Sequence, residues 1–171
     1  MAATARIVNH EMHLYNFAPV AAIGLFGGAV LKNRKLAFMM PLLALFIGDL
    51  YIELFTTNPL QRGFYGVEQI FVYGGMFLVT LLGLQMKNIK AAKILGFSLS
   101  GSVIFFVLSN FGSFMSGMYG YSFEGLTTTY IMAIPFFKNT LLGDLVGNSL
   151  LFGSYFLLQQ AFTNKTVDLR A

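Results

Sequence analysis

The chain has 171 residues, of which 56% are hydrophobic and 11% are charged, and its mean hydropathy is +0.69. Soluble domains carry about 25% charged residues, so this composition excludes an ordinary soluble domain. A spanning helix needs roughly 20 apolar residues, so membrane spans use nearly all of the single domain 1–171 and leave no room for a separate catalytic domain. The absence of cysteine excludes disulfides and cysteine-ligated metal clusters.

Apolar blocks predict an all-α, polytopic membrane helix bundle with five spans, at about 15–31, 36–55, 64–86, 91–115 and 139–162. Turn residues separate the spans, among them Pro59, because proline cannot continue a helix. The remaining block, at about 126–137, is too short to cross a membrane alone and contains Pro135. We therefore expect a re-entrant or interfacial segment there.

The basic residues are distributed unevenly between the two sides of the predicted bundle. If the spans alternate in direction, one side receives Lys32, Arg34, Lys35, Lys87, Lys90, Lys93, Lys165 and Arg170, and the other receives only Arg6, Arg62 and Lys138. By the positive-inside rule the first side is cytoplasmic, which places the N-terminus outside and the C-terminus inside. The net charge of +4 is thus explained by the membrane rather than by nucleic acid.

The first residues of the chain carry no apolar core of a cleavable signal peptide. The small residues from Met1 to Arg6 resemble the end of an earlier helix. A sixth span, missing or truncated before Met1, is therefore kept as an alternative to five.

Polar and ionisable side chains inside the predicted spans are the strongest functional clue, because each charge there costs at least about 2.5 kcal/mol. At 1.5 Å per residue, the predicted spans place all of them in the outer half of the membrane, whereas the inner halves contain almost no charge. This common depth predicts one outward-facing polar pocket. The residues that carry the argument are Asp49, Glu53, Glu68, Tyr73, Asn110, Asn139, Asp144 and Asn148.

A structural role for the same residues is the main alternative. Asp49 can pair with Lys138 or Arg62, and Asp144 and Asn148 can bridge helices. Two pairs of glycines with small-x-x-x-small spacing indicate close helix packing; they are Gly24 with Gly28 and Gly143 with Gly147.

Catalytic and metal-binding motifs are not evident in the sequence. It has no nucleophile elbow, no His-Glu-x-x-His and no phosphate-binding glycine loop. His10 and His13 form only a weak metal motif. Asp49 and Asp144 each follow a glycine, as in intramembrane aspartyl proteases, but the rest of that signature is lacking. We therefore expect no enzyme activity, no metal and no cofactor.

Three sequence runs carry a family resemblance over most of the chain, from Asn16 to Phe162. The run from Asn16 to Ala29 with Pro41 and Gly48-Asp49-Leu50, and the run from Ile134 to Leu141, resemble helices of the S components of energy-coupling factor transporters. Together with Ser109-Asn110-Phe111-Gly112, they resemble more closely a family of small, uncharacterised bacterial membrane proteins that are S-component-like.

This resemblance implies a subunit of the bacterial inner membrane that binds a vitamin-like molecule or a metal ion from outside for uptake. Its implied partners are the lipid bilayer, a transmembrane coupling subunit and ATPases. The resemblance adds Asn16, Tyr130 and Lys138 to the candidate ligand-binding residues, beside Asn110 and Asn139. The alternative function is a non-transporting structural or assembly subunit, whose polar groups bind a partner's helix.

Overall fold

The computed structural model describes residues 19–55 and 62–168, with the backbone alone for 163–168. This part of the chain is helical and contains no strand, as the sequence predicts. The helices are α2 (Val20–Val30), α3 (Arg34–Phe55), α4 (Val67–Leu84), α5 (Ala91–Met115) and α6 (Phe123–Asp168).

Short polar residues define where two of the helices begin. The Asn33 side chain accepts hydrogen bonds from the N–H groups of Lys35 and Leu36 and so caps the start of α3. The Ser122 hydroxyl accepts a hydrogen bond from Gly125 N–H at the start of α6 in the same way. Both caps supply acceptors for N–H groups that lack partners in the first helical turn.

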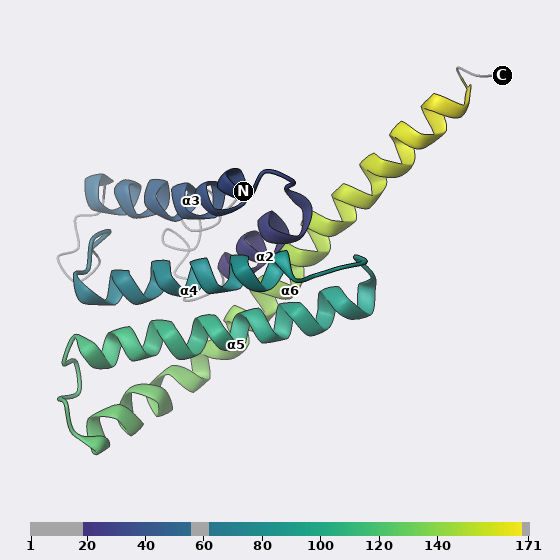
Figure 1. Ribbon diagram of the computed structural model, residues 1–171. Coiled ribbons are helices and arrows are strands. Elements are labelled where there is room, and N and C mark those ends of the chain that lie inside the picture. Colours follow the sequence, from purple (N-terminus) through teal and green to yellow (C-terminus); the bar gives the residue numbers. More distant parts are fainter. Residues whose placement is uncertain (1–18, 56–61, 169–171) are drawn as a thin grey trace.

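Helices α3, α4 and α5 lie side by side and alternate in direction, whereas α6 crosses them obliquely and its C-terminal part projects beyond them (Figure 1). The turns 31–33 and 85–90 lie at one end of the bundle, which we call the basic end because it carries Lys32, Lys87 and Lys90. Residues 62–66 and 116–122 lie at the opposite end, which we call the loop end.

Four helices, α3, α4, α5 and α6, are long and apolar enough to cross a membrane, so the chain is a membrane protein, as its composition predicts. In contrast, α2 has 11 residues. At about 1.5 Å per residue it extends about 16 Å, half of the roughly 30 Å hydrocarbon core. Within the described residues, the expected span at 15–31 is therefore only a half-length helix.

The expected separate segment at 126–137 is wrong. Helix α6 runs without interruption from Phe123 through Pro135. Proline has no backbone N–H, so the carbonyl four residues earlier loses its helical hydrogen-bond partner. Membrane helices tolerate such a loss when neighbouring groups compensate for it. The predicted last span at 139–162 is consequently the continuation of a longer helix that starts at the loop end.

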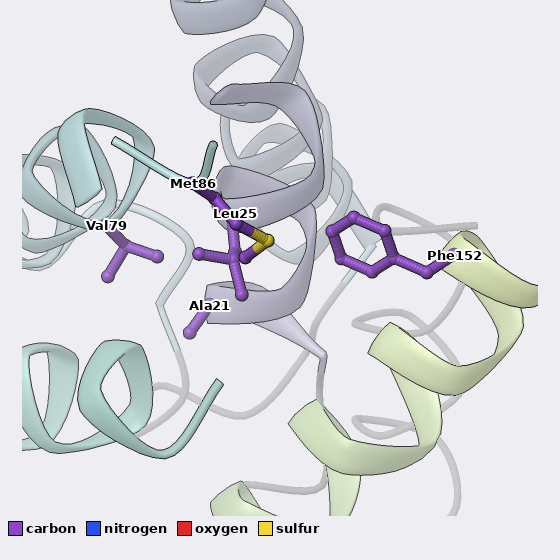
Figure 2. Packing of buried hydrophobic residues seen from close by; sticks show 5 residues of the cluster. All are labelled: Ala21, Leu25, Val79, Met86 and Phe152. Atoms are coloured by element: carbon purple, nitrogen blue, oxygen red, sulfur yellow. The ribbon is translucent and has the colours of Figure 1, made fainter. Parts of the chain in front are cut away.

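The core of the bundle forms around α2, which contacts each of the other four helices. Ala21 and Leu25 of α2 are buried together with Val79, Met86 and Phe152, and Figure 2 shows Phe152 reaching from α6 toward Leu25. The outer surfaces are apolar too, for example at Met39, Met40, Leu43 and Phe46 of α3. This pattern is expected where lipid replaces water as the solvent of the helix surfaces.

Candidate functional site

Asp49 links α3 to α4 in the interior of the bundle. Its side chain is fully buried, and its Oδ2 atom accepts hydrogen bonds from the Tyr73 hydroxyl at 2.8 Å and from Gln69 Nε2 at 3.2 Å. Gln69 and Tyr73 are one helical turn apart on α4, so both face α3. We call these three residues the Asp49 network.

Glu53 follows Asp49 by one turn on α3 and holds the segment that leads into α4. Its Oε2 atom accepts hydrogen bonds from the backbone N–H groups of Gly63 at 3.0 Å and Phe64 at 3.2 Å. Only glycine fits at position 63, because a Cβ atom there would overlap the Asp49 carbonyl oxygen of α3. The segment therefore lies directly on the α3 backbone.

Glu68 brings a third carboxylate to the loop end. It lies in the first turn of α4, and its Oε1 atom accepts a 2.7 Å hydrogen bond from the Ser116 hydroxyl at the end of α5. The hydrogen bonds described for Asp49, Glu53 and Glu68 thus come from uncharged O–H and N–H donors. Three acidic side chains of adjacent helices gather at this end as a result.

Asp144 of α6 belongs to a different part of the bundle. Its side chain is also fully buried, and its two oxygens accept hydrogen bonds from Ala22 N–H at 3.1 Å and from the Ser102 hydroxyl at 2.7 Å. Pro19 at the N-cap of α2 provides no side-chain acceptor. The Asp144 carboxylate takes that role from another helix, where the positive end of the α2 dipole favours it.

Asn148 extends this arrangement by one turn along α6. It is 2% exposed, and its Nδ2 atom donates a 2.8 Å hydrogen bond to the Ser98 hydroxyl. Ser98 and Ser102 are likewise one turn apart on α5, so two parallel contacts connect α5 and α6. We call Asp144, Asn148, Ser98 and Ser102 the Asp144 network.

The two networks lie at different depths, so the predicted common depth is not observed. Ser98 and Ser102 follow the start of α5 at the basic end by about 10 and 16 Å of helix, which places the Asp144 network in the middle of the bundle. The expectation of one depth depended on a last span that begins at residue 139. Since α6 begins at Phe123 instead, Asp144 lies far from the loop end.

The remaining candidate residues are distributed along α5 and α6. Asn110 Nδ2 donates to Phe106 O of its own helix, and the Tyr130 hydroxyl donates to Val107 O, which joins α6 to α5. Lys138 is exposed and Asn139 is half-buried. Asn16, like His10 and His13, lies outside the described residues.

The candidate packing glycines lie at helix contacts. A Cβ atom on Gly28 of α2 would overlap backbone atoms of α4, and one on Gly24 would meet the Met76 sulfur at 2.7 Å. Gly147 of α6 lies against Pro19 and Ala22 in the same way. Gly143 is buried.

Sequence reasoning missed Ser98, Ser102 and Gly63 as the hydrogen-bond partners of Asn148, Asp144 and Glu53, respectively. The spacing of the two serines, one turn apart in an apolar helix, was an available signal. Among the described residues, no group of three or more His, Asp or Glu side chains could hold a metal ion.

A protein family described as a family of unknown function (DUF6580) matches residues 1–166. No curated protein and no solved structure matches the chain.

Proposed function

The chain belongs to this family of unknown function, and we propose that it is a membrane-embedded subunit that binds a small polar solute at the loop end. The observation that carries the proposal is the gathering of Asp49, Glu53 and Glu68 at that end, on adjacent helices. Placing carboxylates inside or beside membrane spans costs free energy. Binding of a solute is a function that would explain why these carboxylates are present.

The charge at the loop end favours a solute with a cationic group. The described hydrogen bonds of Glu53 and Glu68 come from neutral donors, and a cationic group of a ligand would supply the positive charge that these donors lack. Asp49 is buried behind them and fixed by Tyr73 and Gln69. Tyr73 also contributes an aromatic ring, on whose face a cation can bind.

The distribution of lysines supports capture from outside the cell. The basic end, with Lys32, Lys87 and Lys90, is cytoplasmic by the positive-inside rule. The loop end then faces the exterior of the bacterial inner membrane. In this orientation the subunit binds its solute from outside, as S components of energy-coupling factor transporters do, and a coupling subunit with ATPases would complete uptake.

A binding screen with an isosteric variant tests the proposal. Small polar solutes, starting with cationic ones, are added to the purified protein. Thermal unfolding is followed by circular dichroism, because the chain contains no Trp for a fluorescence measurement. We expect a hit that stabilises the wild type and fails to stabilise Asp49→Asn. The matched control is Glu124→Gln, which removes an exposed carboxylate from the first turn of α6.

Two results would count against a solute site at the loop end. One is a solute that stabilises the wild type and Asp49→Asn equally, which would place its binding elsewhere. The other is a screen in which vitamins, amines and metal ions all leave the unfolding midpoint unchanged.

A structural or assembly subunit is the second candidate, and the Asp144 network favours it. Asp144 binds Ser102 and Ala22 inside the bundle, so this buried charge holds three helices together. If Asp49 has the same kind of role, its substitution lowers stability and the recovery of companion subunits, with no change in solute binding. Co-purification of companion membrane subunits distinguishes this candidate from the first.

A further inference from the structure

Asp144 places a negative charge in the middle of the bundle. Its side chain is fully buried, and its described hydrogen-bond donors, the Ala21 and Ala22 N–H groups and the Ser102 hydroxyl, carry no formal charge. A carboxylate offers about four lone-pair sites, of which these donors occupy three. The partial positive charge at the start of α2 offsets about half of one elementary charge. A substantial part of the charge therefore remains without compensation from these groups.

Asn148 supplies a second, independent observation at the same place. Its Oδ1 atom is buried and has no hydrogen-bond partner among the described residues, although its Nδ2 atom binds Ser98. Buried polar atoms almost always have a partner, so this oxygen indicates a bound group. Asn148 follows Asp144 by one helical turn, which places both side chains on the same face of α6.

We propose that the Asp144 network binds one sodium ion between α5 and α6, beside the first turn of α2. The network offers carboxylate, amide and hydroxyl oxygens, the ligand type that hard cations require. One carboxylate matches one positive charge, whereas Ca²⁺ takes six to eight oxygen ligands and commonly several carboxylates. The ion supplies a partner for Asn148 Oδ1 and balances the charge of Asp144.

The position within the bundle agrees with an ion site. Helix α2 starts in the membrane interior, at the level of Ser102 and Asp144, and membrane transporters build ion sites where helices are interrupted near the midplane. A buried water could also bind Asn148 Oδ1, but water would leave the Asp144 charge unbalanced. The two occupants are distinguished by their response to salt.

The experiment compares thermal unfolding of the purified full-length protein in sodium, potassium and choline chloride at equal ionic strength. We expect the unfolding midpoint to rise with sodium concentration until it saturates, and to rise much less in the other two salts. Binding of radioactive sodium to the wild type should saturate over the same concentration range. The solute site at the loop end lies in a separate network, so this test is independent of it.

Two variants assign the sodium effect to the network. Asn148→Ala removes the unpartnered oxygen and should abolish both the stabilisation by sodium and the binding of radioactive sodium. Ser149→Ala is the control, because this neighbouring hydroxyl is exposed and binds Leu145 O of its own helix; it should respond like the wild type. If Asn148→Ala does not fold, Ser98→Ala is the second variant, with weakened sodium binding expected.

The proposal is overturned if the three salts give the same unfolding midpoints and no sodium binds. It is also overturned if Asn148→Ala and Ser98→Ala keep the full response to sodium. In the first case a water molecule occupies the network, and in the second case sodium binds elsewhere.

Discussion

The contact between α2 and α4 leaves no space for a side chain at Gly83, which makes this glycine a sensitive test of the fold. A Cβ atom there would overlap the Leu25 carbonyl oxygen and lie 3.1 Å from Gly28 Cα. These neighbours are backbone atoms, so no side-chain rotation relieves the overlap and the two helices must separate. The Gly83→Ala variant should therefore be less stable than a glycine-to-alanine variant at a helix position where the new methyl group has free space.

Gly74 provides a matched control on the same helix, because a Cβ atom there meets nothing within 4 Å. Replacing glycine by alanine in a helix gains about 1 kcal/mol from propensity at either position. Overpacking costs typically about 1–3 kcal/mol and applies only at Gly83. The free energies of unfolding of Gly83→Ala and Gly74→Ala should thus differ by about 1–3 kcal/mol, with Gly74→Ala the more stable.

Thermal unfolding in one detergent, followed by circular dichroism, measures this difference. For a chain of 150–250 residues, 1 kcal/mol shifts the midpoint by about 2–4 °C, so a 2 kcal/mol gap corresponds to about 4–8 °C. If Gly83→Ala unfolds at the same temperature as Gly74→Ala, or higher, the close approach of α2 and α4 is wrong.

Three further changes have defined outcomes. Phe152→Ala removes a core side chain that is 1% exposed and packs edge-on against the Phe26 ring. The free energy of unfolding should fall by about 3–5 kcal/mol, and a decrease below 1 kcal/mol would contradict the packing around α2. Asp144→Leu leaves Ala22 N–H without its acceptor, at a cost of about 1–3 kcal/mol, whereas the Ser102 hydroxyl can still donate to Ser98 O. The variant should therefore unfold below Asp144→Asn, which keeps one acceptor; equal midpoints would refute the capping role. Glu53→Ala should speed hydrogen exchange at the Gly63 and Phe64 amides with little effect on the midpoint, because Glu53 is exposed; unchanged exchange would show that these bonds do not hold the segment.

Hydrophobic runs predicted the helical class and the positions of α3, α4 and α5 well. The ends of these helices coincide with short-range sequence signals, such as the capping residue Asn33 at the start of α3. The start of α6 was missed because Pro135 was treated as a break. A break at Pro135 would leave further backbone groups unpaired where lipid offers no hydrogen bonds, so the helix continues. The error displaced Asp144 and Asn148 in depth.

The partners of the acidic residues depend on contacts between helices that are distant in sequence. The carboxylates themselves were identifiable, since charge in an apolar span is conspicuous. That Asp144 caps α2 through Ala22, while Asp49 binds Tyr73 of α4, follows only from the packing of the helices. Sequence spacing placed residues on helix faces correctly, but it does not specify which helix each face contacts.

The most direct test of the central claim is native mass spectrometry of the protein purified gently from its own membrane. We expect a small polar molecule that remains bound to the wild type and to Glu124→Gln and is lost from Asp49→Asn. A ligand-free protein that instead carries other membrane subunits, with the same subunits absent from Asp49→Asn, would contradict solute binding and establish the assembly function.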